Sequence, residues 1–115
     1  MADEQPKRVK GELYQMIVDG DVDGFNAHRD RDKPCDMRGL DFRGQDLRKM
    51  DVDGIDFSGS YFRQADLRGL NLSGCRLEGA SIRGAKVSGV LFPAELSPPE
   101  IRLSLDFGTR LRYGV

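Results

Sequence analysis

Large apolar residues recur at every fifth position through the middle of the chain. Small or apolar residues stand two positions before most of them, Asp or Asn stands directly before many, and Gly follows two positions after most. Self-similarity at a fixed period is the sequence signature of a repeat architecture. The twelve members of the series, which are predicted to form the structural core, are Met37, Phe42, Leu47, Val52, Phe57, Phe62, Leu67, Leu72, Leu77, Ile82, Val87 and Phe92.

A period of five fits neither a regular helix nor a straight strand. Five residues of an α-helix advance by about 500°, so the apolar positions would spread around the cylinder. In a straight strand an odd period would place successive members on opposite faces. All members can point inward only if the chain turns once in every repeat, and the recurring Gly tolerates the dihedral angles of such turns.

Residues 65–69 read Ala-Asp-Leu-Arg-Gly, and on such units the segment 35–94 resembles the pentapeptide-repeat family. The family motif is a small residue, Asp or Asn, Leu or Phe, and two variable positions. The resemblance implies an all-β solenoid, namely a right-handed quadrilateral β-helix with four repeats per coil and therefore about three coils. Leu40, Gln45, Met50 and Ile55 depart from the motif, because the family prefers Ala there.

The N-terminal segment, residues 1–34, is predicted to close one end of the solenoid with a short helix. An uncapped end coil would expose apolar core and unpaired backbone edges. Val9, Leu13, Met16 and Ile17 have helical spacing, and Gly20 follows as a stop signal. Residues 20–29 are similar to a segment that precedes the first coil in bacterial members, with Phe25 and His28 in place of two Trp residues. We expect this segment to pack on the first coil.

The C-terminal segment, residues 95–115, is predicted to contain a second capping helix. Ser97 is a good N-cap, Pro98 suits the first helical position, and Glu100 completes a capping box. Gly108 is predicted to end the helix, and the tail 109–113 alternates like a short strand. This segment is also a candidate contact for a homodimer.

The composition indicates which kinds of partner and which cellular location to expect. Lys and Arg total 18 against 19 Asp and Glu, so the net charge of −1 indicates neither a nucleic-acid nor a membrane partner. No secretory signal or apolar run of about 20 residues is visible, and a cytoplasmic location is expected. Cys35 and Cys75 would lie two coils apart, too far for a disulfide, and they lack the spacing of a zinc site.

No catalytic set is visible in the chain. The single histidine, His28, has no nucleophile in a recognisable motif, so neither enzyme activity nor a cofactor is expected. The run Asp19–Asp30 matches the front of a calcium-binding EF-hand loop. However, the twelfth position is Asp rather than Glu, and Asn26 occupies the usual apolar eighth position. We therefore expect a solvated acidic turn and no metal.

Arg43, Arg63 and Arg83 are predicted to stack as a surface ladder, one residue per coil. Such a ladder could bind phosphate or an acidic protein. We favour a structural interpretation, in which each Arg meets an Asp three residues later, as Arg43 with Asp46 and Arg63 with Asp66. Exposed pairs of this kind contribute little energy but would neutralise the ladder.

The predicted function is a non-enzymatic protein-binding or scaffold module that presents rigid flat faces to an unidentified protein partner. One alternative is a topoisomerase-binding DNA mimic, as are the quinolone-resistance members of the family that the repeats resemble. Such mimics need a long and strongly acidic rod, whereas residues 35–94 carry nine Lys and Arg against eight Asp and Glu. The other alternative is a calcium-responsive binder that uses Asp19–Asp30.

Overall fold

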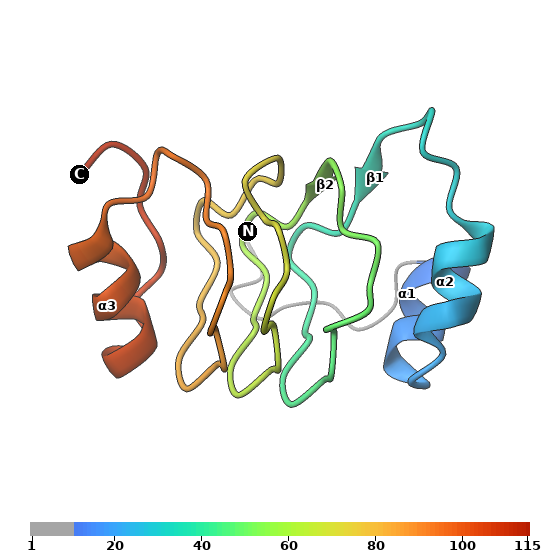
Figure 1. The fold of residues 1–115 in the computed structure, drawn as a ribbon, viewed down its shortest axis with the longest axis horizontal. Helices are drawn as coiled ribbons and strands as arrows, with labels where there is room; N and C mark the ends of the chain where they lie inside the picture. The colour runs from blue at the N-terminus through green and yellow to red at the C-terminus, as the bar shows by residue number, and fades with distance from the viewer. Residues whose placement is uncertain (1–10) are drawn as a thin grey trace, which may run out of the picture.

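The computed structural model describes residues 11–115. Its elements, in chain order, are α1 (Gly11–Val18), α2 (Val22–His28), β1 (Cys35–Asp36), β2 (Ile55–Asp56) and α3 (Pro98–Phe107). A stack of coils lies between the α1–α2 pair at one end and α3 at the other (Figure 1). Val9, which was assigned to the predicted first helix, lies outside the described residues.

Parallel backbone pairing joins residues that are twenty positions apart. β1 pairs with β2 in the register Cys35↔Ile55, and isolated bridges such as Asp41↔Tyr61 and Tyr61↔Ser81 continue the ladder. The amide of Phe42 donates to the carbonyl of Tyr61 at 2.7 Å, and the amide of Phe62 donates to Ser81 at 2.8 Å. The backbone pairing therefore has the twenty-residue period that the repeat predicts.

The expectation of an all-β solenoid over residues 35–94 is only partly right. Within residues 11–115, β1 and β2 are the only strands, and each has two residues. The remaining pairing consists of isolated β-bridges. The reason is that a turn closes every five residues. The amide of Ala65 donates to the carbonyl of Phe62 at 3.0 Å, and that of Leu70 donates to Leu67 at 3.1 Å. Only two or three extended residues remain between turns.

The third residue of most of these turns has a positive φ. Gly69 has a φ of 78°, which together with the closing hydrogen bond corresponds to a type II turn, where Gly is favoured for steric reasons. Gln64 occupies the same position with a φ of 58°, and it is the only residue other than Gly with a positive φ among residues 11–115.

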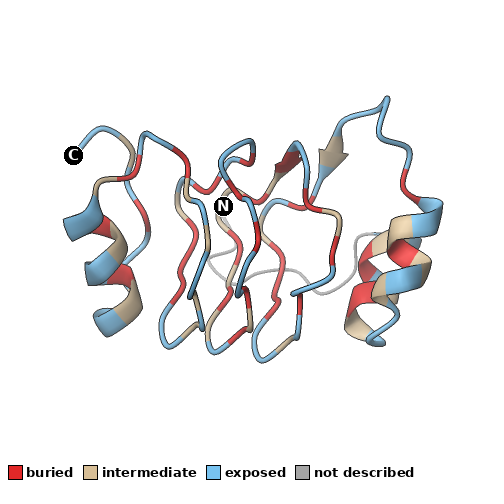
Figure 2. Ribbon diagram, viewed as in Figure 1, coloured by how far each residue is buried: buried red, intermediate tan, exposed pale blue. Residues whose placement is uncertain are grey.

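The predicted core positions belong to the hydrophobic core or pack against it. Figure 2 shows that buried segments recur along the coils. Ten of the twelve are buried, whereas Val87 and Phe92 in the last coil are half-buried. Phe42 and Phe62 stack at 5.2 Å between ring centroids, and Phe57 meets Phe62 edge-on at 5.1 Å. Aromatic rings from successive coils therefore form the centre of the core.

Two helices, rather than the predicted one, pack against the first coil. Tyr14 of α1 and Phe25 of α2 are fully buried, and the hydroxyl of Tyr14 donates to the backbone carbonyl of Asp41 at 2.7 Å. His28, in contrast, is exposed, and its Nδ1 lies 2.8 Å from the carbonyl of Gly24. The segment that was expected to pack on the first coil therefore buries Phe25 but not His28.

Helix α3 begins and ends at the predicted residues. The hydroxyl of Ser97 accepts the amide of Glu100 at 3.4 Å, and Gly108 ends the helix with a φ of 74°. The capping box is wrong in its second half, because the carboxylate of Glu100 accepts from Arg112 instead of returning to Ser97. The tail forms no named strand, but Leu111 exchanges two backbone hydrogen bonds with Gly79 and Ala80.

Candidate binding surface

Asp and Arg residues on either side of a buried core residue form ion pairs along the surface. Arg43 reaches Asp41 at 2.6 Å, with Phe42 buried between them. The same arrangement joins Arg48 to Asp46 at 2.7 Å. Residues two apart on an extended segment point to the same side, so both charged groups face outward. The same carboxylates also accept the backbone amides of these arginines, as Asp41 does from Arg43 at 3.0 Å.

These contacts correct the predicted pairing. The predicted partner of each Arg was the Asp three residues later, but the pairs in the structure run to the Asp two residues earlier, as Arg38 to Asp36 and Arg68 to Asp66. A turn separates an Arg from the following Asp, whereas only one inward-facing residue separates it from the preceding one. The alternation of side chains in an extended triplet was the signal that could have found this.

The ion pairs shift the pKa values of their members. A hydrogen bond from the Arg48 side chain holds the pKa of Asp46 well below its usual range, and a hydrogen bond from the Arg68 side chain lowers the pKa of Asp66. The side chain of Asp46 raises the pKa of Arg48 in return. Arg48 also lies 3.4 Å from Asp66 on the next coil, so the pairs are linked across coils. These carboxylates are ionised throughout the neutral range.

The predicted ladder of Arg43, Arg63 and Arg83 is not uniform. Arg43 is paired with Asp41, but Tyr61 and Ser81 occupy the positions from which an Asp would reach Arg63 and Arg83. Arg63 lies over the ring of Tyr61 at 4.9 Å, and its Nε donates to the Ser81 hydroxyl at 3.3 Å. No carboxylate within residues 11–115 forms an ion pair with either arginine. The predicted Arg63–Asp66 pair is therefore absent from the described chain, and the ladder is neutralised only at Arg43.

A shallow depression of about 600 Å³ opens beside this ladder. Arg43, Arg63 and Arg83 contribute to its lining, together with Leu105 and Asp106 of α3. Asp106 lies 3.6 Å from Arg102 within the same helix. The last turn of α3 thus forms one wall of the depression, and the three coils form the other.

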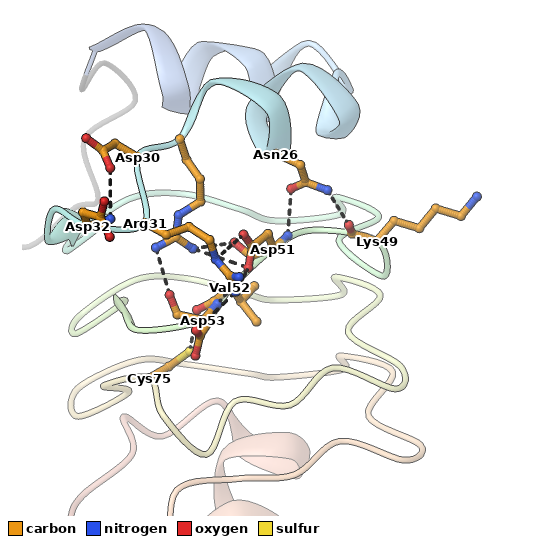
Figure 3. A network of polar contacts seen from close by, with 10 residues as sticks. Asn26, Asp30, Arg31, Asp32, Lys49, Asp51, Val52, Asp53 and Cys75 are labelled. Carbon is orange, nitrogen blue, oxygen red and sulfur yellow. Dashed lines mark hydrogen bonds and ion pairs between the residues drawn. The ribbon is translucent and has the colours of Figure 1, made fainter.

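The N-terminal segment is fixed to the first coil through backbone groups (Figure 3). The side chain of Asn26 donates to the carbonyl of Lys49 and accepts the amide of Asp51, both at 2.8 Å. Arg29 is 8% exposed and donates to the carbonyls of Asp51 and Asp53, both at 2.8 Å. The segment was predicted to pack on the first coil, but no role was predicted for Asn26 or Arg29, which make these contacts.

Asp19–Asp30 does not form a calcium loop. Seven of its residues, Val22–His28, form helix α2, and the Asp21 side chain caps that helix by accepting the amide of Gly24 at 2.9 Å. An EF-hand loop requires these positions to wrap around one ion. No group of three potential metal ligands occurs within the described part of the chain. Helix α2 therefore occupies positions that the calcium-responsive alternative assigns to a loop.

The two cysteines are both free thiols. Cys75 is buried, and its Sγ lies 3.0 Å from the carbonyl of Val52. Burial raises the pKa of Cys75 to about 11, and burial also raises the pKa of Cys35. Both thiols are therefore protonated at neutral pH, and neither has the low pKa of a reactive cysteine.

Parallel coils of twenty residues, each closed by turns at five-residue intervals, define a class of repeat protein. A family model described as pentapeptide repeats matches residues 55–92 in eight copies. Residues 55–92 therefore consist of pentapeptide repeats, and the parallel pairing begins one coil before this segment, at Cys35. Leu40, Gln45 and Met50 stand in that first coil where the motif has a small residue. No curated protein and no solved structure matches the chain.

None of the helices in residues 11–115 has both the length and the apolar character needed to cross a membrane.

Proposed function

We propose that this chain is a non-enzymatic binding module that presents rigid, flat faces to a protein partner. The observation that carries the proposal is the parallel ladder with its twenty-residue register. Such a ladder fixes the exposed side chains of successive coils at about 4.8 Å spacing, so each face is a preformed pattern of charges. A preformed surface loses little conformational entropy on binding.

The polar residues of the faces support a binding role. Asp41 and Arg43, like Asp66 and Arg68, hold one another in fixed positions at 2.6 and 2.7 Å. Surface charges of mixed sign select partners by complementarity and suppress contacts between like charges. The family to which the repeats belong suggests a scaffold or binding module rather than an enzyme.

We further infer that the coils form the right-handed quadrilateral β-helix that the repeats imply. Four turns close within one coil, as at Phe57, Phe62, Leu67 and Leu72, where each carbonyl accepts the amide three residues later. Four turns in twenty residues give four straight sides. The chain then offers four faces, on which Arg38, Arg43, Arg48 and Asp53 are exposed in the first coil.

The helical segments would act as caps in this arrangement. Residues 11–34 cover the first coil through Asn26 and Arg29, and residues 95–115 cover the last coil through α3 and Leu111. The homodimer through the C-terminal segment stays a prediction. Leu103 and Phe107 of α3 are 38% and 70% exposed, which leaves apolar surface for such a contact.

A DNA mimic remains the weaker alternative. One negative charge for about every 1.7 Å of axis is needed to imitate the duplex. The chain has a net charge of −1, and the arginines on its faces offset most of the carboxylates. Its charge pattern therefore favours a protein partner over the imitation of DNA.

Affinity capture with one variant for each face tests the proposal. Arg38→Ala, Arg43→Ala, Arg48→Ala and Asp53→Ala each alter an exposed residue of one face and leave the core untouched. We expect the wild-type protein to retain a stoichiometric protein partner from cells that produce it. We expect one variant to lose most of this partner while the other three retain it. Capture that is equal for all four variants and for urea-unfolded bait would contradict the proposal.

A further inference from the structure

The depression beside α3 carries two positive charges that no carboxylate balances. Arg43 is paired with Asp41 at 2.6 Å, and Asp106 is paired with Arg102 at 3.6 Å. Arg63 and Arg83 have no ion pair with any residue of the segment 11–115. The charged groups that line the depression therefore sum to about +2, whereas the chain as a whole is near neutral.

The imbalance arises from departures from the repeat in a single column. In this column Asp41 precedes Phe42, but Tyr61 and Ser81 replace Asp before Phe62 and Ile82. The guanidinium of Arg63 uses only its Nε, toward the Ser81 hydroxyl at 3.3 Å, so its terminal amino groups have no acceptor within residues 11–115. The guanidinium of Arg83 makes no hydrogen bond in the same part of the chain.

The two side chains are held close together. Their backbones lie on neighbouring coils, which are about 4.8 Å apart. Both pack against Gly108 at the end of α3: a Cβ on Gly108 would lie 3.4 Å from Nη2 of Arg63 and 3.1 Å from Cδ of Arg83. Two planar guanidinium groups in this arrangement offer several N–H donors to one oxyanion.

The negative end of the α3 helix dipole compensates only part of this positive charge. The C-terminus of a helix attracts cations because it carries about −0.5 of an elementary charge. Arg63 and Arg83 lie beside this terminus at Gly108, which favours their position. The dipole nevertheless leaves most of two positive charges without compensation.

We propose that Arg63 and Arg83 bind one phosphate monoester, and that the protein partner carries it on a phosphorylated side chain. A monoester has about −1.5 to −2 charges at pH 7 and three acceptor oxygens, which match two arginines. A carboxylate or a phosphodiester has one charge and would leave one arginine unbalanced. The source of the phosphate rests on the proposed function, but the site itself does not.

Nuclear magnetic resonance titration of the purified chain with O-phospho-L-serine tests the site. We expect saturable shifts of the backbone amides of Arg63, Gln64, Arg83 and Gly84, with millimolar affinity. The double variant Arg63→Gln/Arg83→Gln is expected to weaken binding by roughly tenfold or more. The matched control is Arg48→Gln/Arg68→Gln in the neighbouring column, where both arginines already have Asp partners, and we expect its affinity to match the wild type.

The double variant could lose binding because it fails to fold, so a second variant retains both arginines. Tyr61→Asp restores the repeat residue beside Arg63, and we expect it to weaken phosphoserine binding severalfold. Lowering the pH from 8 to 5 is expected to weaken wild-type binding, because the monoester loses its second charge near pH 6. Shifts that survive the double variant, or that are lost equally in the Arg48/Arg68 control, would overturn the site.

The affinities of other phosphate compounds show which kind of phosphate the site prefers. We expect a short phosphoserine peptide to bind more tightly than inorganic phosphate, and we expect a single-stranded oligonucleotide to bind more weakly for each phosphate. Tighter binding of inorganic phosphate would overturn the assignment to a side chain, and tighter binding of the oligonucleotide would overturn the monoester. These results need no partner, so their failure is distinct from a failure of the capture experiment.

Discussion

Phe62 stacks on Phe42 of the preceding coil, meets Phe57 of its own coil edge-on, and is 2% exposed. Removing its ring would leave a cavity that the rigid ladder cannot close. We expect Phe62→Ala to lower the free energy of unfolding by about 3–5 kcal/mol. Chemical denaturation measures this change. Lys49→Ala, at an exposed side chain, is the control and should change the stability by less than about 0.5 kcal/mol. An equal loss in both variants would contradict the inward position of Phe62.

Gln64 holds a backbone conformation that favours Gly. A side chain in the left-handed region costs about 1–2 kcal/mol, part of which Gly would lose again through the entropy of the unfolded chain. We expect Gln64→Gly to stabilise the protein by about 0.5–1 kcal/mol, measured as a rise in the melting temperature.

The reverse change at an equivalent turn is the matched control. Gly69 has a φ of 78°, and a Cβ there would meet no atom within 4 Å. Gly69→Ala therefore adds backbone strain without a steric clash and should destabilise the fold by about 1 kcal/mol. If Gln64→Gly and Gly69→Ala both raised or both lowered the stability, backbone strain would not determine the stability of these turns.

At the scale of the elements, Glu100 links α3 to the tail that follows it. Its carboxylate is 3% exposed and accepts the backbone amide and the guanidinium of Arg112, at 3.0 and 2.9 Å. The hydrogen bond from the Arg112 side chain lowers the pKa of Glu100. Because the folded pKa lies below the unfolded value of about 4.3, this carboxylate stabilises the fold above that pH. The stabilisation is lost as the pH falls through the folded pKa.

The variant Glu100→Gln isolates this contribution. We expect the stability difference between wild type and variant to be largest above about pH 5 and to shrink as the pH falls below 4. Denaturant unfolding at a series of pH values measures this difference. A difference that grows toward low pH would show that Glu100 does not act through its charge.

Some elements could be predicted from the sequence, and others could not. The five-residue spacing from Met37 to Phe92 predicted the twenty-residue coil, because only a turn in every repeat brings these residues inside. Helix α2 was missed, because Val22–His28 contains Gly24 and has no clear apolar period. The second half of the capping box was wrong, because Arg112 offers Glu100 a charged partner that is twelve residues away.

The candidate site was predicted only in outline. The column of Arg43, Arg63 and Arg83 was visible in the sequence, but its partners were assigned to the wrong side of each repeat. The absence of Asp at positions 61 and 81 was also visible in the sequence. It indicates that Arg63 and Arg83 lack an ion pair within residues 11–115 only once it is known that each Arg pairs with the residue two positions earlier. The contact of both arginines with Gly108 depends on the packing of α3, which no local pattern shows.

At the scale of the whole molecule, the stack of coils depends on its ends. Helix α3 and the tail satisfy backbone groups of the last coil: the amide of Gly84 donates to Leu105, and that of Gly79 donates to Leu111. Deleting residues 97–115 would expose this edge and the buried Leu77, Ala80 and Ile82 beneath it. We expect the shortened chain to aggregate, as size-exclusion chromatography would detect. A soluble and folded monomer would contradict the assignment of a cap.

Hydrogen exchange of the ladder amides tests most directly the claim that the coils form one rigid scaffold. We predict that the amides of Phe42, Leu47, Phe57, Phe62 and Leu67 exchange only when the whole repeat segment unfolds. Their opening free energies should then agree with one another and with the free energy of unfolding from denaturation. Exchange in the middle coil, at Phe57, Phe62 and Leu67, that is orders of magnitude faster than global unfolding would contradict a rigid binding surface.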